Sequence, residues 1–203
     1  MRSGRGWPPA ASRWLLATLA TAVATTSVAV VAPDAVDLPQ LGAMDAVVAP
    51  VAALLGWVAA LAATTAAGEP CPEVFATAPR RAHAVNLARV VLTLATFTCA
   101  AAIAASARPM TVAGLSARTS LALTGEGLAM ASVAGLRSCW LPMTAHLLAS
   151  ATLGAANRPD LARWAWVVSA ETGTAQLTLS TLLFLTGMTA WRLRARTVLS
   201  ERG

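Results

Sequence analysis

The chain has 203 residues, of which 57% are hydrophobic and only 12% are charged, and its formal net charge is +6. Soluble domains carry about 25% charged residues, so the composition excludes an ordinary water-soluble fold. Every basic side chain is Arg, and both Lys and Tyr are absent, which we interpret as codon bias in a GC-rich bacterial genome. The arginines flank apolar segments and form no basic run, so they predict membrane anchoring and no nucleic-acid partner.

Apolar segments separated by Pro, Gly and charged residues predict an all-α integral membrane protein, a bundle of about six transmembrane helices with both termini cytoplasmic. The predicted spans are 14–32, 46–67, 85–106, 119–136, 139–156 and 164–191, inside a transmembrane domain of residues 14–197. Four or five helices are the alternatives. Five would place one basic terminus outside, whereas four would follow if residues 119–157 do not cross the membrane.

The first span follows a basic N-terminus, residues 1–13, which we place in the cytoplasm. A cleaved signal peptide is the alternative, with Val30 and Ala32 at the −3 and −1 positions. The apolar run exceeds the usual length of about 7–15 residues, and Pro33 would follow the cut. We therefore favour an uncleaved helix.

The segment of residues 33–45 carries three Asp and no basic residue, which predicts a short external loop. The second span follows and holds Pro50 in its first turn, where proline is tolerated. Residues 68–83 contain prolines and the pair Arg80–Arg81, so they predict an internal loop.

An external turn is expected after the third span, ending near Arg118. Residues 119–157 are then too long for one crossing, and a break at Arg137–Ser138 divides them into two short spans. The last span is bracketed by tryptophans, as is typical of membrane interfaces. Its end carries Arg192, Arg194 and Arg196 and is followed by a cytoplasmic tail, residues 198–203.

Three ionisable side chains inside the predicted spans form a candidate intramembrane cluster, because such groups are costly in lipid and often functional. They are Glu126, His146 and Glu171. The predicted boundaries place both carboxylates roughly 10 Å and the imidazole roughly 16 Å below the outer surface. If their helices adjoin, the groups could relay protons or hold a divalent cation. The alternative is that each is satisfied separately by headgroups or by Ser and Thr neighbours.

A second candidate is a polar stripe on one face at the inner end of the third span. It consists of Asn86, Arg89, Thr93 and Thr96. The stripe could bind an anionic headgroup or line an inner vestibule. The alternative is that Arg89 extends to the interface while the threonines pack against a neighbouring helix. A similar stripe on the last span would suit a polar path: Glu171, Thr174, Thr178 and Thr181.

We predict no cofactor, no metal site and no catalytic residue. Cys71, Cys99 and Cys139 are odd in number and widely spaced, so they make neither a disulfide framework nor a zinc site. His83 and His146 lie at different predicted depths, which disfavours a haem held between them. The chain has no phosphate-binding loop and no nucleophile or metalloprotease motif.

Three functions remain. The favoured one is a non-catalytic partner or scaffold in a larger complex of the plasma membrane, which associates through the small residues of its helices. The same faces would also serve a homo-oligomer. The first alternative is a small proton- or cation-coupled transporter or channel that uses Glu126, His146 and Glu171. The second is a membrane enzyme that acts on a lipid-soluble substrate.

Overall fold

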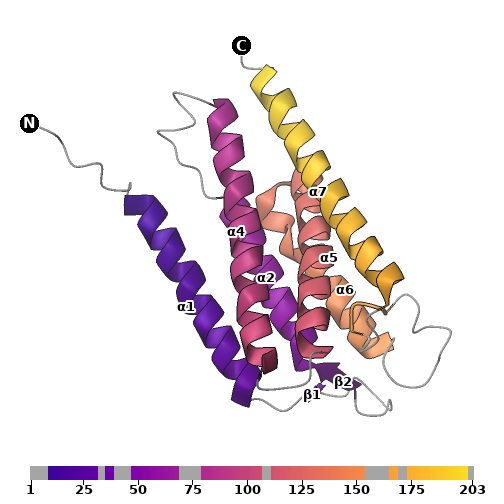
Figure 1. The fold of residues 1–203 in the computed structure, drawn as a ribbon. Helices are drawn as coiled ribbons and strands as arrows, with labels where there is room; N and C mark the ends of the chain where they lie inside the picture. Colours follow the sequence, from indigo (N-terminus) through magenta and orange to yellow (C-terminus); the bar gives the residue numbers. More distant parts are fainter. Residues whose placement is uncertain are drawn as a thin grey trace, which may run out of the picture.

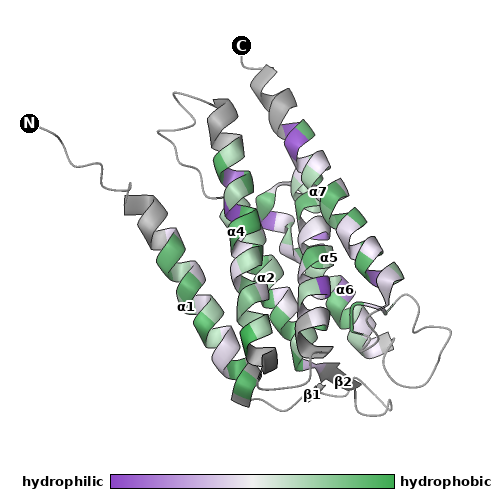
Figure 2. Cartoon of the chain, viewed as in Figure 1, coloured by the Kyte–Doolittle hydropathy of each residue, from purple (hydrophilic) through white to green (hydrophobic). Residues whose placement is uncertain are grey.

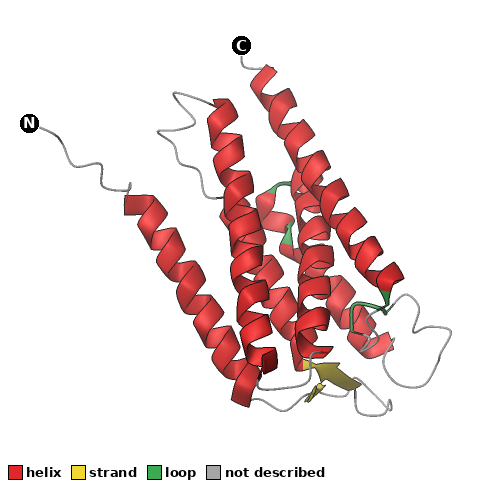
Figure 3. Cartoon of the chain, viewed as in Figure 1, coloured by secondary structure: helices red, strands yellow, loops and turns green. Residues whose placement is uncertain are grey.

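The computed structural model describes residues 9–31, 35–38, 47–68, 79–106, 111–153, 165–168 and 173–200. This part of the chain is all-helical apart from one small sheet (Figure 3). The α-helices are α1 (Pro9–Val31), α2 (Val51–Gly68), α4 (Pro79–Ser106), α5 (Thr111–Ala134), α6 (Trp140–Leu153) and α7 (Thr174–Ser200). A 3-10 helix, η1 (Leu136–Ser138), joins α5 to α6.

Consecutive helices run up and down the bundle, so the beginning of α1 and the end of α7 lie at the same end (Figure 1). We call this the η1 end and the opposite one the sheet end. The central helices are α2 and α5, which pack closely on each other, while α4 packs on both. At the two edges, α1 rests mainly on α4, and α7 rests mainly on α5.

Small residues allow this close packing. Six alanines of α2 are almost completely buried: Ala53, Ala59, Ala60, Ala63, Ala66 and Ala67. A Cβ added at Gly56 of α2 would lie 2.7 Å from the Cβ of Thr119 in α5. The backbones of α2 and α5 therefore approach more closely than larger side chains would permit, as is usual for helices that associate in lipid.

A two-stranded antiparallel sheet lies where an external loop and the start of the second span were predicted. Strand β1 (Ala35–Leu38) pairs with β2 (Val47–Pro50), with Ala35 opposite Pro50. The β-branched Val47 and Val48 favour a strand. Pro50 ends it, and α2 begins at the next residue, Val51.

Two helix boundaries differ from the prediction. The helix α5 begins at Thr111, so Arg118 lies inside it and not in an external turn. Residues 166–168 form a turn, and α7 begins at Thr174 instead of Trp164. The carbonyls of Trp166 and Val167 accept hydrogen bonds from the side chains of Arg118 and Thr119 in α5. These hydrogen bonds replace the backbone hydrogen bonds that the two carbonyls would accept in a helix.

The expected break near Arg137 coincides with η1. Gly135 ends α5 with a φ of 90°, a conformation that side-chain-bearing residues rarely adopt. Pro142 lies in the first turn of α6, where it costs no backbone hydrogen bond. With 14 residues, α6 extends for only about 21 Å.

Two helical segments of the described chain are long and apolar enough to cross a membrane, Val51–Gly68 and Ala84–Ile103. The apolar part of α1, Trp14–Val28, is shorter. Strongly hydrophilic residues are few in the coloured parts of the helices, and hydrophobic residues predominate in α1, α2 and α4 (Figure 2). The length and hydropathy of these two helices thus favour a membrane location for the chain.

Candidate functional site

The structure brings Glu126 of α5 and His146 of α6 into contact. His146 Nδ1 lies 2.6 Å from Glu126 Oε1, and the two side chains are 22% and 18% exposed. Because α5 begins at Thr111 and ends at Ala134, Glu126 lies fifteen residues after the start of its helix and eight before its end. The contact ties α5 to α6 and gives each of the two polar groups a partner inside the bundle.

The third member of the predicted cluster, Glu171, lies outside the described residues. No group of three or more His, Cys, Asp or Glu side chains that could hold a metal occurs within the described parts of the chain. Among the described residues, Glu126 and His146 therefore form a pair.

Arg118 is the most deeply placed charged side chain of the described bundle, with 1% of its surface exposed. Its Nη2 donates to the carbonyl oxygen of Trp166 at 2.5 Å, and its Nη1 donates to Gln176 Oε1. The guanidinium carbon also lies 5.9 Å from the centroid of the Trp166 ring, within cation–π range. Arg118 therefore fastens both the turn of residues 166–168 and the start of α7 to α5.

Trp166 connects this anchor to the carboxylate–imidazole pair. Its ring meets that of His146 edge to face, with centroids 6.1 Å apart and an interplanar angle of 76°. Together Gln176, Arg118, Trp166, His146 and Glu126 form a continuous set of contacts, which we call the polar array. The array runs from the sheet end of the bundle to its middle and joins three helices and one turn.

Sequence reasoning missed Arg118 and Gln176. The nearby Arg108 and Pro109 suggested that the external turn continued to Arg118, although Ser116, Thr119 and Ser120 sit beside it. All three are buried. This run of polar residues near the start of a helix could have indicated that Arg118 faces the interior of the bundle.

The predicted inner stripe mostly faces the interior: Asn86, Arg89 and Thr93 are buried, and Thr96 is half-buried. Asn86 Nδ2 donates to the carbonyl of Ala67 at 3.3 Å, which links α4 to α2. The Arg89 guanidinium lies 5.4 Å from the ring centroid of Trp14 in α1. At 5% exposed, it is buried between α4 and α1.

The threonine stripe of α7 faces outward. Thr174, Thr178 and Thr181 are all exposed. Thr178 and Thr181 each donate to the backbone carbonyl four residues earlier, at 2.9 and 2.8 Å. The sequence suggested that this stripe would suit a polar path. In the structure, these three side chains face away from the bundle and line no path through it.

Of the cysteines, Cys99 is exposed on α4 and Cys139 is buried at the start of α6. Cys71 and the side chain of His83 lie outside the described residues. No family model matches this chain, and no curated protein or solved structure is significantly similar to it. Function must be inferred from the geometry.

Proposed function

We propose that this chain is a multi-pass protein of the plasma membrane with six spans. Large apolar side chains are exposed on α1, α4, α6 and α7, whereas a dozen hydroxyl, amide and guanidinium side chains are buried. Soluble proteins bury most of their large apolar side chains, expose most of their polar ones and rarely have such extended apolar surfaces. In lipid, outward Leu and Val match the acyl chains, and inward polar groups find partners on neighbouring helices.

Charged residues support an orientation with the η1 end in the cytoplasm. Arg137, Arg192 and Arg194 are exposed at that end. Arg194 also donates to the carbonyl of Ser132 in the last turn of α5, where a cation is stabilised by the helix dipole. Exposed Trp140 lies at the same level, as expected for an interfacial aromatic ring.

Labelling of single cysteines in intact cells tests the six-span arrangement. We expect a membrane-impermeant maleimide to label Gly173→Cys from outside and to label Arg137→Cys only after the membrane is opened. Both positions are described and lie at opposite ends of the bundle. The native cysteines are replaced in this background. Labelling of both positions from the same side would contradict six spans.

Within the membrane, we propose that the protein is a non-catalytic partner in a larger complex and binds a transmembrane helix of another protein through α7. The observation that carries this proposal is the position of α7, which packs mainly on α5 and leaves its opposite face exposed, where Leu182 and Leu185 lie. The hydroxyls of Thr178, Thr181 and Thr189 are bonded within α7, so their methyl groups face outward. Such short side chains permit close helix approach in lipid.

A photoreactive amino acid at position 181, introduced in living cells, tests this docking face. We expect one discrete adduct with a second membrane protein, and we expect its loss when Thr178→Phe is added. Thr21 of α1 is the matched control, because it is exposed and its hydroxyl bonds Ala17 in the same way. Equal adducts from positions 21 and 181 would indicate collisions in the membrane and would contradict docking on α7.

Proton coupling is the second candidate, favoured by the 2.6 Å contact between Glu126 and His146 and by their partial exposure. The variant Glu126→Gln separates the two functions. If the protein acts as a docking partner, the adduct at position 181 persists in this variant. If it moves protons, purified protein in vesicles shows a proton flux that falls at least about tenfold in Glu126→Gln, the loss expected when an essential proton carrier is removed.

A further inference from the structure

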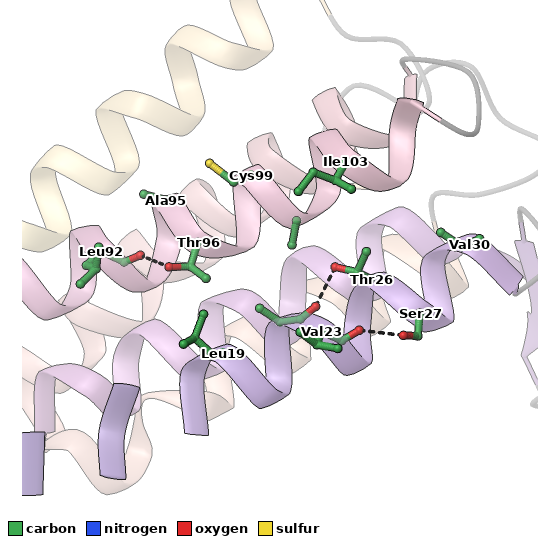
Figure 4. A pocket seen from close by; sticks show the side chains of 12 residues that line it. Leu19, Val23, Thr26, Ser27, Val30, Leu92, Ala95, Thr96, Cys99 and Ile103 are labelled. Carbon is green, nitrogen blue, oxygen red and sulfur yellow. Dashed lines mark hydrogen bonds between the residues drawn. The ribbon is translucent and has the colours of Figure 1, made fainter. Parts of the chain in front are cut away.

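An apolar groove runs between α1 and α4 (Figure 4), and no residue of the polar array lines it. Its volume is about 780 Å³. It extends along the helices from Leu19 and Leu92 to Val30 and Ile103, which lie towards the sheet end. The two helices run side by side in the same direction here, and Ala22 lines the groove and belongs to a small buried cluster with Ala59 and Phe97.

The polar atoms of the groove need no polar ligand. Thr26 donates to the Ala22 carbonyl at 2.7 Å, and Ser27 donates to the Val23 carbonyl at 3.0 Å. Thr96 donates to the carbonyl of Leu92 at 2.8 Å. Each hydroxyl is therefore satisfied within its own helix, and the surface that remains consists of methyl and methylene groups and the Cys99 thiol. A polar ligand would lose its hydration in this groove without gaining new hydrogen bonds.

The dimensions of the groove fit hydrocarbon chains better than a helix. Residues 92–103 rise by about 16 Å, which is about half of the 30 Å hydrocarbon core of a bilayer. The volume divided by this length gives a cross-section of about 50 Å², whereas a helix about 10 Å wide needs about 80 Å². Beyond Leu92, about one helical turn away, the contact between Arg89 and Trp14 joins α1 to α4 and ends the groove.

We propose that the groove binds the hydrocarbon chains of a membrane lipid, which enter at Val30 and Ile103 and stop at Leu19 and Leu92. This inference rests on the proposed membrane location of the chain. In the proposed orientation, the lipid belongs to the outer leaflet. The bound chains fill the groove along both helices, so the lipid acts as a packing element between α1 and α4.

The test uses full-length protein in phosphatidylcholine vesicles that contain a trace of the same lipid with a photoreactive group in its acyl chain. We expect crosslinks to concentrate in residues 19–30 and 92–103. The variant Ala95→Leu fills part of the groove and should lower this labelling about fivefold, the loss expected when one or two methylene contacts are excluded. Ala102→Leu is the matched control, since Ala102 is exposed on α4 but does not line the groove.

Labelling spread evenly over α1, α4 and α7 would mean ordinary lipid contact and would overturn the proposal, as would an equal loss in both variants. A disulfide between Cys99 residues of two copies, formed on mild oxidation, would show that a second copy fills the groove and would also overturn it. Flotation with the vesicles is measured in parallel. Protein that floats but lacks groove labelling contradicts the lipid site alone, whereas protein that does not float contradicts the membrane location.

Discussion

Replacement of Arg118 by methionine is expected to destabilise the bundle by about 3 kcal/mol or more, because it leaves buried acceptors without donors. The guanidinium holds the Trp166 carbonyl and Gln176 Oε1 at once. Methionine replaces the apolar stem of the side chain but not the guanidinium, so the loss of stability measures mainly the charged hydrogen bonds and the contact with the Trp166 ring. For a chain of this size, such a change lowers the thermal midpoint by about 6–12 °C.

Thermal unfolding of the purified protein in a mild detergent measures this effect. Arg137→Met is the matched control, since Arg137 is exposed on η1, and its midpoint should move by less than about 2 °C. Gln176→Leu removes one of the acceptors of Arg118 and should give an intermediate loss. An Arg118→Met protein as stable as the control would show that the guanidinium contacts do not hold the turn and α7 in place.

The helical class of the chain and the position of its main break follow from local features that a sequence displays directly. Long apolar runs, Gly135 and Pro142 define the end of α5 and the beginning of α6 without reference to the rest of the fold. The contact of Glu126 with His146 follows from placing two adjacent spans side by side. The sequence could suggest that contact but not its 2.6 Å distance or its depth.

The features that the sequence did not reveal depend on contacts between distant segments. Arg118 looked like a loop residue because its partners, the Trp166 carbonyl and Gln176, are 48 and 58 positions away. The turn at residues 166–168 looked like the beginning of a helix for the same reason. The outward direction of the α7 threonines was also hidden, since their spacing fits either face of a helix and only the position of α5 decides between them.

Gly187→Ala is expected to separate α7 from α5, because the added methyl group would overlap the carbonyl of Gly125. A Cβ at Gly125 would in turn overlap the backbone of Leu183. Both obstacles are main chain, so no side chain can rotate aside. Overpacking at such a site costs typically about 1–3 kcal/mol, and here we expect the upper end or more. Gly173→Ala is the matched control, as nothing lies within 4 Å of its added Cβ.

The same variant connects the fold to the proposed docking function. Since α7 rests mainly on α5, a forced shift at the Gly125–Gly187 crossing moves the outward face of α7 but leaves the contact between Glu126 and His146, which joins α5 to α6. We therefore expect Gly187→Ala to abolish the photo-adduct at position 181 and to lower the thermal midpoint, while Gly173→Ala changes neither. An unchanged midpoint in Gly187→Ala would contradict the glycine crossing. A lower midpoint with an intact adduct would show instead that the partner binds α7 wherever it lies.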